Sequence, residues 1–161
     1  MIARAINKSS VKRTIDERDH VALVAMFDED PARVLRFLTR LTYNPSGDTH
    51  DAAIEGLRVL SEQRSEQHPD FFREIMRRSL WAMNEEGGNN SWSAPEIIGA
   101  VIAGNPHRFG TFFSYNYCAA VEELMFQPSL VKAYQMVADA DKGLAAEFAE
   151  RIATLESELQ E

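Results

Sequence analysis

The chain has little of what small proteins use for covalent, metal or membrane chemistry. A single cysteine, Cys118, occurs in 161 residues, which excludes an internal disulfide framework and a zinc site built from cysteines. No stretch approaches 18 consecutive apolar residues, so the sequence predicts no membrane span. Basic residues are also scarce: 17 lysines and arginines face 25 aspartates and glutamates, a formal net charge of −8. Nucleic-acid binders usually carry the opposite balance, so we expect neither nucleic acid nor membrane as a partner.

The common catalytic signatures are missing as well. The sequence contains no G-x-S-x-G, no G-x-x-x-x-G-K-[ST] and no G-x-G-x-x-G after a strand. No pair of histidines has the H-x-x-x-H or H-x-H spacing of a metal site; the four are His20, His50, His68 and His107. The apolar neighbours of Cys118 favour an inert buried thiol. These absences favour a protein that is not an enzyme, with no cofactor and no metal site.

The first 18 residues differ in charge from the rest. They hold five basic and two acidic residues, a local net charge of +3, which leaves −11 for residues 19–161. They lack the apolar stretch of a secretory signal, and a mitochondrial leader matches their composition only weakly. We therefore expect a basic tail or a short first element over 1–18, a single all-α repeat domain over 19–161, and a cytoplasmic protein.

Helical periodicity is the main feature that the sequence does have. Apolar residues recur at the spacing of one helix face, as in Phe72, Ile75, Met76, Leu80 and Met83. Prolines stand at the start of four such segments, where a missing N–H removes no helical hydrogen bond; these are Pro31, Pro69, Pro106 and Pro128. The spacing predicts a leading helix near 19–28 and helix pairs over roughly 31–66, 69–104, 106–126 and 128–159. The second helices are expected near 49–66, 94–103, 116–126 and 142–159. The predicted fold is all-α, a short α-α superhelix of helix pairs stacked side by side.

One predicted connection, residues 84–93, is longer than the usual helix-to-helix loop. It lies in the string Trp81-Ala-Met-Asn84-Glu85-Glu86-Gly87-Gly88, which is followed by Trp92-Ser-Ala-Pro95-Glu96-Ile97-Ile98-Gly99. This string, with helix pairs of about 37 residues over most of 30–159, resembles small HEAT-like helical-repeat proteins of prokaryotes, of the phycobilisome-lyase type. The resemblance implies the fold and no particular activity. Nothing beyond the repeat shape points to a tetrapyrrole site.

The segment that follows this loop predicts a helix start. Ser93 and Glu96 have the S-x-x-E spacing of a capping box, in which the serine oxygen accepts from the Glu96 N–H and the glutamate reaches back to the Ser93 N–H. Pro95 fits the first helical turn, and Gly99 permits close approach of a neighbouring helix. We expect structural roles for all four.

The leading hypothesis for function is a non-enzymatic protein-interaction or scaffold module. Its binding surface would be the edge of the helical array and the 84–93 loop, and its partner a protein or peptide. We expect the loop to be ordered and folded back, with at least one of its tryptophans largely buried; a tryptophan that lines a recognition patch is the alternative. The candidate binding residues are Trp81, Asn84, Glu85, Glu86, Asn89, Asn90, Trp92 and His107.

The alternative function is a small-molecule or enzymatic site, possibly metal-dependent, built from Asn84, Glu85, Glu86 and His107. Two carboxylates can perform acid–base chemistry when their environments differ. A deep pocket with converging polar groups would favour this interpretation, whereas two solvated glutamates would favour the interaction module.

Two further features allow a structural and a functional interpretation. Five aromatic rings occur within residues 109–117, which we expect to fill a core between helices, with a stacking surface for a flat ligand as the alternative. Arg73, Arg77 and Arg78 form a basic strip on one helix. We expect it to be solvated and paired with Glu74 and its neighbours, with contact to an anion or a partner as the alternative.

Overall fold

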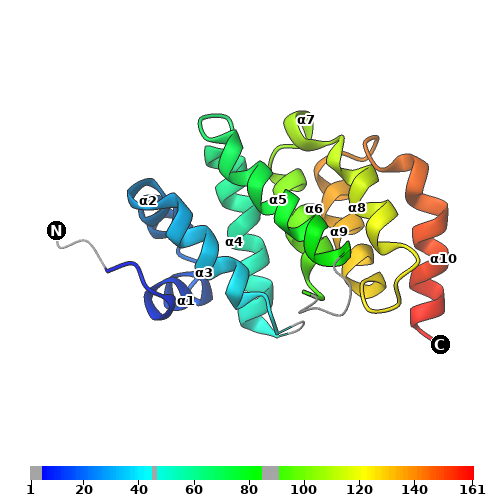
Figure 1. Cartoon of the computed structure of the whole chain (residues 1–161), viewed down its shortest axis with the longest axis horizontal. Helices are drawn as coiled ribbons and strands as arrows, with labels where there is room; N and C mark the ends of the chain where they lie inside the picture. Colours follow the sequence, from blue (N-terminus) through cyan, green and yellow to red (C-terminus); the bar gives the residue numbers. More distant parts are fainter. Residues whose placement is uncertain (1–4, 45–46, 85–90) are drawn as a thin grey trace.

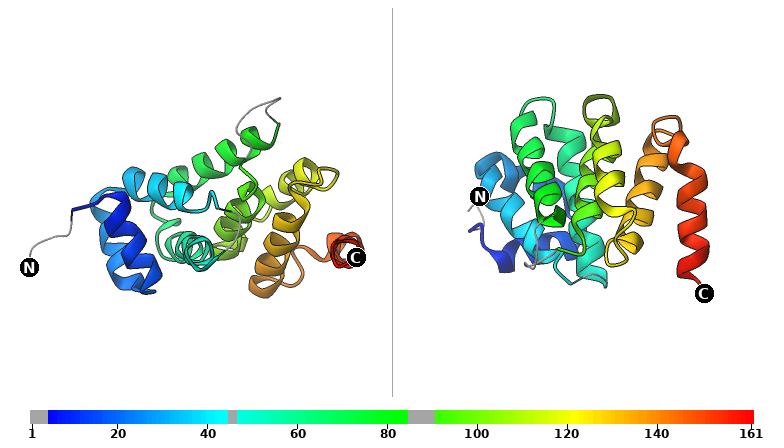
Figure 2. Two further views of the ribbon diagram at one scale, coloured as in Figure 1. Left: turned by 90° about the horizontal axis from the view of Figure 1, so that it is seen from below. Right: turned by 45° about the vertical axis from the view of Figure 1, so that its right-hand side comes forward.

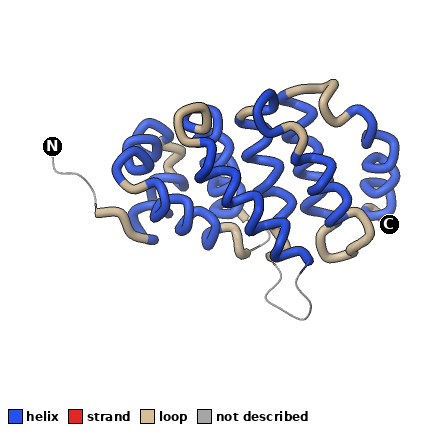
Figure 3. The backbone as a smooth tube through the Cα atoms, turned by 45° about the horizontal axis from the view of Figure 1, so that its top comes forward, coloured by secondary structure: helices blue, strands red, loops and turns tan. Residues whose placement is uncertain are grey.

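The computed structural model describes residues 5–44, 47–84 and 91–161. Within these ranges the chain forms helices and turns and no strand (Figure 3), so the expected all-α class is confirmed. The helices are α1 (Lys8–Asp16), α2 (His20–Glu29), α3 (Pro31–Leu41), α4 (Asp48–Arg64), α5 (Pro69–Asn84), α6 (Ala94–Gly104), α7 (Pro106–Phe109), α8 (Phe112–Ala120), α9 (Gln127–Ala140), the 3-10 turn η1 (Ala146–Phe148) and α10 (Ala149–Leu159).

The helices begin where the prolines predict. Proline occupies the first turn of α3, α6, α7 and α9, and α5 starts at Pro69. Side chains cap two of these helices: Asp30 accepts from the Arg33 N–H at 3.2 Å, and Asn105 accepts from the Arg108 N–H at 3.3 Å. Each cap satisfies one of the amide groups that a helix N-terminus leaves without a partner.

The segment 106–126 differs from the expected helix pair. It forms the four-residue α7 and then α8, which ends at Ala120 instead of running from 116 to 126. The chain turns after α8, and the buried Gln127 side chain donates to the Val121 carbonyl at 2.8 Å, which satisfies one of the carbonyls that the helix end leaves without a helical partner. Cys118 is exposed on α8, so the expectation of a buried thiol is wrong. The buried face of α8 is carried by Phe113, Asn116 and Ala120 instead.

The helices follow one another along the long axis of the molecule, with the two termini at opposite ends (Figures 1 and 2). Buried side chains from Val11 in α1 to Leu155 in α10 belong to one hydrophobic cluster. At the N-terminal end, residues 8–16 contribute Val11 and Ile15 to that cluster. No helix among the described residues is long and apolar enough to cross a membrane.

The central element is α6, which packs mainly against α9, α4 and α5. All ten residues from 94 to 103 are buried. Gly99 makes the closest approach possible, as expected: a Cβ built there would lie 2.7 Å from the Cβ and 2.8 Å from the Cα of Ala133 in α9. The position of α6 matters for the surface described next, because its first turn forms part of the floor beneath α3 and α5.

Candidate binding groove between α3 and α5

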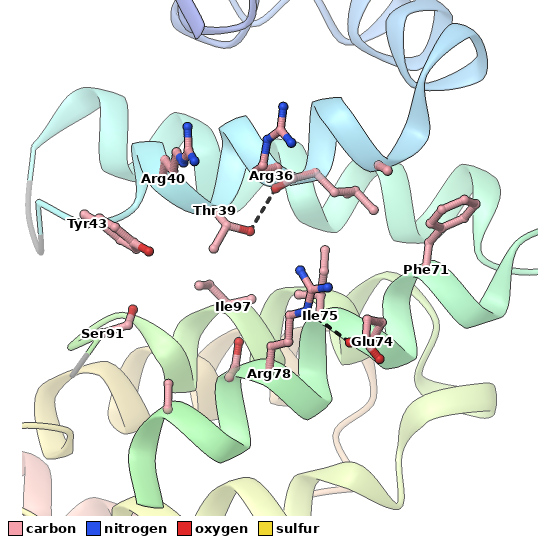
Figure 4. Close-up of a pocket in the computed structure, with 14 residues that line it drawn as sticks. Arg36, Thr39, Arg40, Tyr43, Phe71, Glu74, Ile75, Arg78, Ser91 and Ile97 are labelled. Atoms are coloured by element: carbon pink, nitrogen blue, oxygen red, sulfur yellow. Dashed lines mark hydrogen bonds and ion pairs between the residues drawn. The ribbon is translucent and has the colours of Figure 1, made fainter. Parts of the chain in front are cut away.

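A groove opens between α3 and α5. These two helices run in the same direction (Figure 4) and touch each other little, whereas α4 and α6 pack closely together. The wider separation of the outer helices leaves a hollow of about 520 Å³, within the range of known ligand sites.

The lining positions are spaced 0, 3, 4, 7, 8 and 11 on each wall, which is the spacing of one helix face. At a rise of 1.5 Å per residue, the face on α5 extends for about 16 Å. The helix α3 ends at Leu41, and Tyr43 continues its wall just beyond the helix. The wall residues are Ala32, Leu35, Arg36, Thr39, Arg40 and Tyr43 on the α3 side and Phe71, Glu74, Ile75, Arg78, Ser79 and Ala82 on the α5 side.

The floor of the groove is apolar and its ends carry exposed aromatic rings. Leu35 and Ile97 are buried beneath it, and Ile75 is half-buried. Tyr43, which is 64% exposed, lies at one end, and Phe71, which is 37% exposed, lies at the other. A partner that covered the groove would remove the exposed parts of Ile75, Tyr43 and Phe71 from water, and the burial of apolar surface is the main favourable term in most protein associations.

The rim of the groove is positively charged. Among the described residues that line it, the charged ones are three arginines and one glutamate, a net charge of +2 in a chain of −8. Arg36 and Arg40 stand one turn apart on α3, and Arg78 reaches from α5 into the space between the helices (Figure 4). Glu74 pairs with Arg78 at 3.0 Å. The groove therefore has the charge that complements an acidic ligand.

A second hollow continues this positive surface around the end of α3. Its volume is about 730 Å³, and it shares Arg40 and Tyr43 with the groove. It adds two lysines and one aspartate, Lys8 and Lys12 of α1 and Asp48 of α4. Lys12 pairs with Asp16 at 2.8 Å.

Beside the groove, a buried polar network joins four segments of the fold. His50 of α4 donates from Nδ1 to the Thr42 carbonyl at 3.1 Å, because a carbonyl can only accept. Its Nε2 lies 3.0 Å from Oε2 of Glu96 in α6. The Ser93 hydroxyl donates to the same Thr42 carbonyl at 2.7 Å, and the Glu96 N–H donates to the Ser129 hydroxyl of α9 at 3.0 Å. All five residues are buried.

This network overturns the predicted capping box. Ser93 does occupy the cap position of α6, but its side chain makes no cap hydrogen bond. The expected local partners of Ser93 and Glu96 are replaced by groups from distant segments: Thr42 for the serine, and His50 and Ser129 for the glutamate. The structural roles expected for Pro95 and Gly99 agree with the first turn and the helix contact described above.

The pKa of His50 is raised, first by its hydrogen bond to Glu96 and further by the charge of that carboxylate, while burial acts in the opposite direction. A raised pKa means that folding favours the imidazolium form, which donates from both ring nitrogens. Since the His50 side chain is fully buried and that of Glu96 is 6% exposed, a substrate cannot reach the pair. The pair holds α4 and α6 together beneath the groove.

Among the residues expected to bind, both tryptophans are exposed. Trp81 is 69% and Trp92 55% exposed, so the expectation that at least one is largely buried is wrong. The Asn84 side chain donates to the Leu80 carbonyl at 3.0 Å and so caps the end of α5. The predictions for Glu85, Glu86, Asn89 and Asn90, and the folding back of that part of the loop, lie outside the described residues.

The exposed His107 lies far from the start of the loop. Its neighbour Arg108 pairs with Glu66 at 2.9 Å, which places α7 beside the beginning of α5. Asn84 is the last residue of α5, about 22 Å further along the helix. The structure therefore does not bring Asn84 and His107 into one site.

The arginine strip is paired with Glu74, as expected, and the aromatic segment fills the core only in part: Phe109 and Phe113 are buried, whereas Tyr115 is 63% exposed. Arg77 and Arg78 both pair with Glu74, at 3.2 and 3.0 Å, on the exposed face of α5. The ring of Tyr117 packs against that of Phe148 in a tilted arrangement, with centroids 4.5 Å apart. The aromatic segment thus packs α8 against the turn before α10.

The sequence interpretation missed the groove. Its apolar lining residues Leu35 and Ile75 belong to the stripes that face the core, so helical periodicity gives no separate signal for a second contact surface. Which helices would lie side by side was not evident from these spacings.

Among the described residues, no group of three histidine, cysteine, aspartate or glutamate side chains is arranged to hold a metal ion. The chain matches no protein-family model, no curated protein and no solved structure.

Proposed function

We propose that this protein is a non-enzymatic docking module that binds a protein or peptide partner in the groove between α3 and α5. The observation that carries the proposal is the matched pair of groove walls: two parallel segments with the same spacing of lining residues, above an apolar floor and beneath a positive rim. Interaction grooves of this kind bind a partner through buried apolar anchors, and charges at the rim set orientation and specificity.

The helical arrangement also supports a HEAT-like interpretation, in which α3 with α4 and α5 with α6 are successive helix pairs. Stacks of such pairs expose extended surfaces on one side, which these proteins use for binding. The close packing of α4 on α6, beneath the open spacing of α3 and α5, supports this part of the proposal.

The described ends of the 84–93 loop support its contribution to the same surface. Ser91 lines the groove directly. Trp81 lies one helical turn after Arg78, on a neighbouring part of the α5 surface, and Trp92 follows Ser91. Exposed tryptophans are enriched among residues that dominate binding energy, so both belong to the proposed interface.

Site-specific photo-cross-linking tests the proposal. A photoreactive amino acid replaces Ala82, which lines the groove, or the exposed Ala153 of α10 as the matched control. After irradiation of cells that produce each variant, we expect a discrete cross-linked protein from position 82 and not from position 153. That product should disappear when Arg36 and Arg40 are both changed to glutamate. The same products from both positions, or none from position 82, would refute the proposal.

A further inference from the structure

We infer that the occupant of the groove is an acidic amphipathic helix of about three turns, supplied by a protein partner. This inference rests on the proposed function and specifies the chemistry of the partner.

The shape of the groove favours a helix. The wall on α5 is a helix face about 16 Å long, which equals about 11 residues of an α-helix, and α3 runs parallel to it on the other side. Ridges of a third helix can pack into the groove between the two walls, as in other helix-in-groove complexes. A bound β-strand would need a sheet edge, and the described residues contain no strand. A proline-rich segment needs a groove lined by aromatic rings; here the rings, Tyr43 and Phe71, stand only at the two ends.

The charges favour an acidic helix. Arg36 and Arg40 are separated by four residues, the spacing of neighbours on one helix face, and both are exposed. Among the described residues neither forms an ion pair; the Arg36 guanidinium lies 5.3 Å from the centroid of the Phe37 ring. Two carboxylates spaced i and i+4 on a bound helix would match them. A guanidinium can bind a carboxylate through two hydrogen bonds.

The opposite wall supplies the third cation. Among the described residues, Arg78 pairs only with Glu74, whose side chain is 41% exposed, and an ion pair this close to solvent contributes little. Arg78 can therefore exchange Glu74 for a carboxylate on the other flank of the ligand. The resulting motif is an apolar stripe for Leu35, Ile75 and the floor, with acids at i and i+4 on one side and one acid on the other.

A selection from a random peptide library tests this inference, because it requires no identified partner. Displayed peptides of about 14 residues, long enough for three helical turns and their ends, are selected on the 161-residue chain. A parallel selection uses Ala82→Trp, in which the new ring fills the groove; the matched control, Ala153→Trp, carries the same ring on α10. Peptides that depend on the groove are retained by the wild type and by Ala153→Trp and lost on Ala82→Trp.

We expect these peptides to share an apolar stripe at helical spacing and acids at i and i+4. In fluorescence anisotropy, Arg36→Glu/Arg40→Glu should weaken their binding about tenfold or more. The control is Arg13→Glu/Lys142→Glu, which makes the same change in charge at two exposed sites outside the groove. This control should change the affinity for the peptides less than about twofold. Peptides in which lysines replace the two acids should recover affinity for Arg36→Glu/Arg40→Glu, and such recovery also shows that this variant is folded.

The outcomes separate the two proposals. Peptides that depend on the groove but are basic, proline-rich or without helical spacing would overturn the acidic helix and leave the docking function in place. A selection that yields no peptide dependent on the groove would overturn the docking function itself. The wild-type chain could also dimerise in solution. If Ala82→Trp abolished that dimer and Ala153→Trp did not, the occupant of the groove would be a second copy of the chain, and the inference would be overturned.

Discussion

The buried pair of His50 and Glu96 gives the sharpest prediction for stability. In Glu96→Ala, His50 loses the only side-chain partner that it has among the described residues and keeps its hydrogen bond to the Thr42 carbonyl. Its Nε2 then remains buried without a partner, which costs about 1–3 kcal/mol. The deleted side chain also leaves a cavity next to buried helices, which adds about 1–2 kcal/mol. We expect Glu96→Ala to lower the free energy of unfolding by about 2–4 kcal/mol.

Glu96→Gln separates the loss of charge from the loss of volume. The amide fills the same space and can donate to Nε2 of a neutral His50. Only the charge-assisted part of the hydrogen bond is lost, so we expect a cost of about 1 kcal/mol. Urea denaturation followed by circular dichroism measures both variants. For a chain of this length, each kcal/mol lowers Tm by about 2–4 °C.

The pH dependence gives an independent check on the same pair. Because the pKa of His50 is raised in the folded state, its contribution to stability is complete below its ordinary value of 6.5 and is lost as the pH rises through the folded-state pKa. The difference between wild type and Glu96→Ala should therefore be largest near pH 6 and shrink at alkaline pH. Glu62→Ala, which removes an exposed ion pair with Arg58, is the control and should cost less than about 1 kcal/mol. An unfolding free energy of Glu96→Ala equal to that of Glu62→Ala would refute the reasoning.

Three further predictions follow from other contacts. Gly99→Ala forces a methyl group against Ala133 and should lower the free energy of unfolding by about 1–3 kcal/mol in urea denaturation. The control is Gly143→Ala, because the nearest atom to a Cβ built there lies 3.7 Å away. Equal effects of the two substitutions would contradict the packing argument. The pKa of Glu66 is lowered to about 2 by its arginine partner, so its contribution is present above pH 4.5 and lost as the pH falls towards 2. Glu66→Gln should therefore show a smaller fall in Tm over that interval than wild type, and an unchanged fall would count against the ion pair. Trp92→Ala should change the free energy of unfolding by less than about 1 kcal/mol, since the residue is 55% exposed. A decrease of about 3 kcal/mol or more, measured by thermal unfolding, would mean that the ring packs on the protein.

The sequence predicted those parts of the fold that depend on neighbouring residues. Pro31, Pro69 and Pro106 mark helix starts because a proline ring affects only the turn that contains it. The role of Gly99 was also predicted correctly, since a glycine in an otherwise apolar helix usually indicates a close neighbour.

The errors arose where distant residues replaced local partners. The S-x-x-E spacing of Ser93 and Glu96 is compatible with a capping box, but Thr42 and His50 lie 51 and 46 residues earlier in the chain and bind the two side chains instead. Once both side chains are buried, each needs a partner wherever the fold supplies one. The exposure of Trp92 has a similar origin, because the length and composition of a loop do not show whether distant residues form a surface that could receive the ring.

The groove could not be predicted because it depends on how far apart two helices stand. Leu35 and Ile75 are 40 residues apart in the sequence, and their faces meet only because α4 and α6 set the spacing of α3 and α5. Periodicity identifies the faces of each helix and gives no information on the distance between them.

The central claim, that a partner binds between α3 and α5, is tested most directly by NMR of the isoleucine δ1 methyl groups during titration with a selected peptide. Ile75 and Ile97 line the groove, and the buried Ile152 lies in α10 near the other end of the molecule. We predict that the methyl resonances of Ile75 and Ile97 shift with saturation and that the resonance of Ile152 does not. Saturable shifts at Ile152, with those of Ile75 and Ile97 unchanged, would contradict the account.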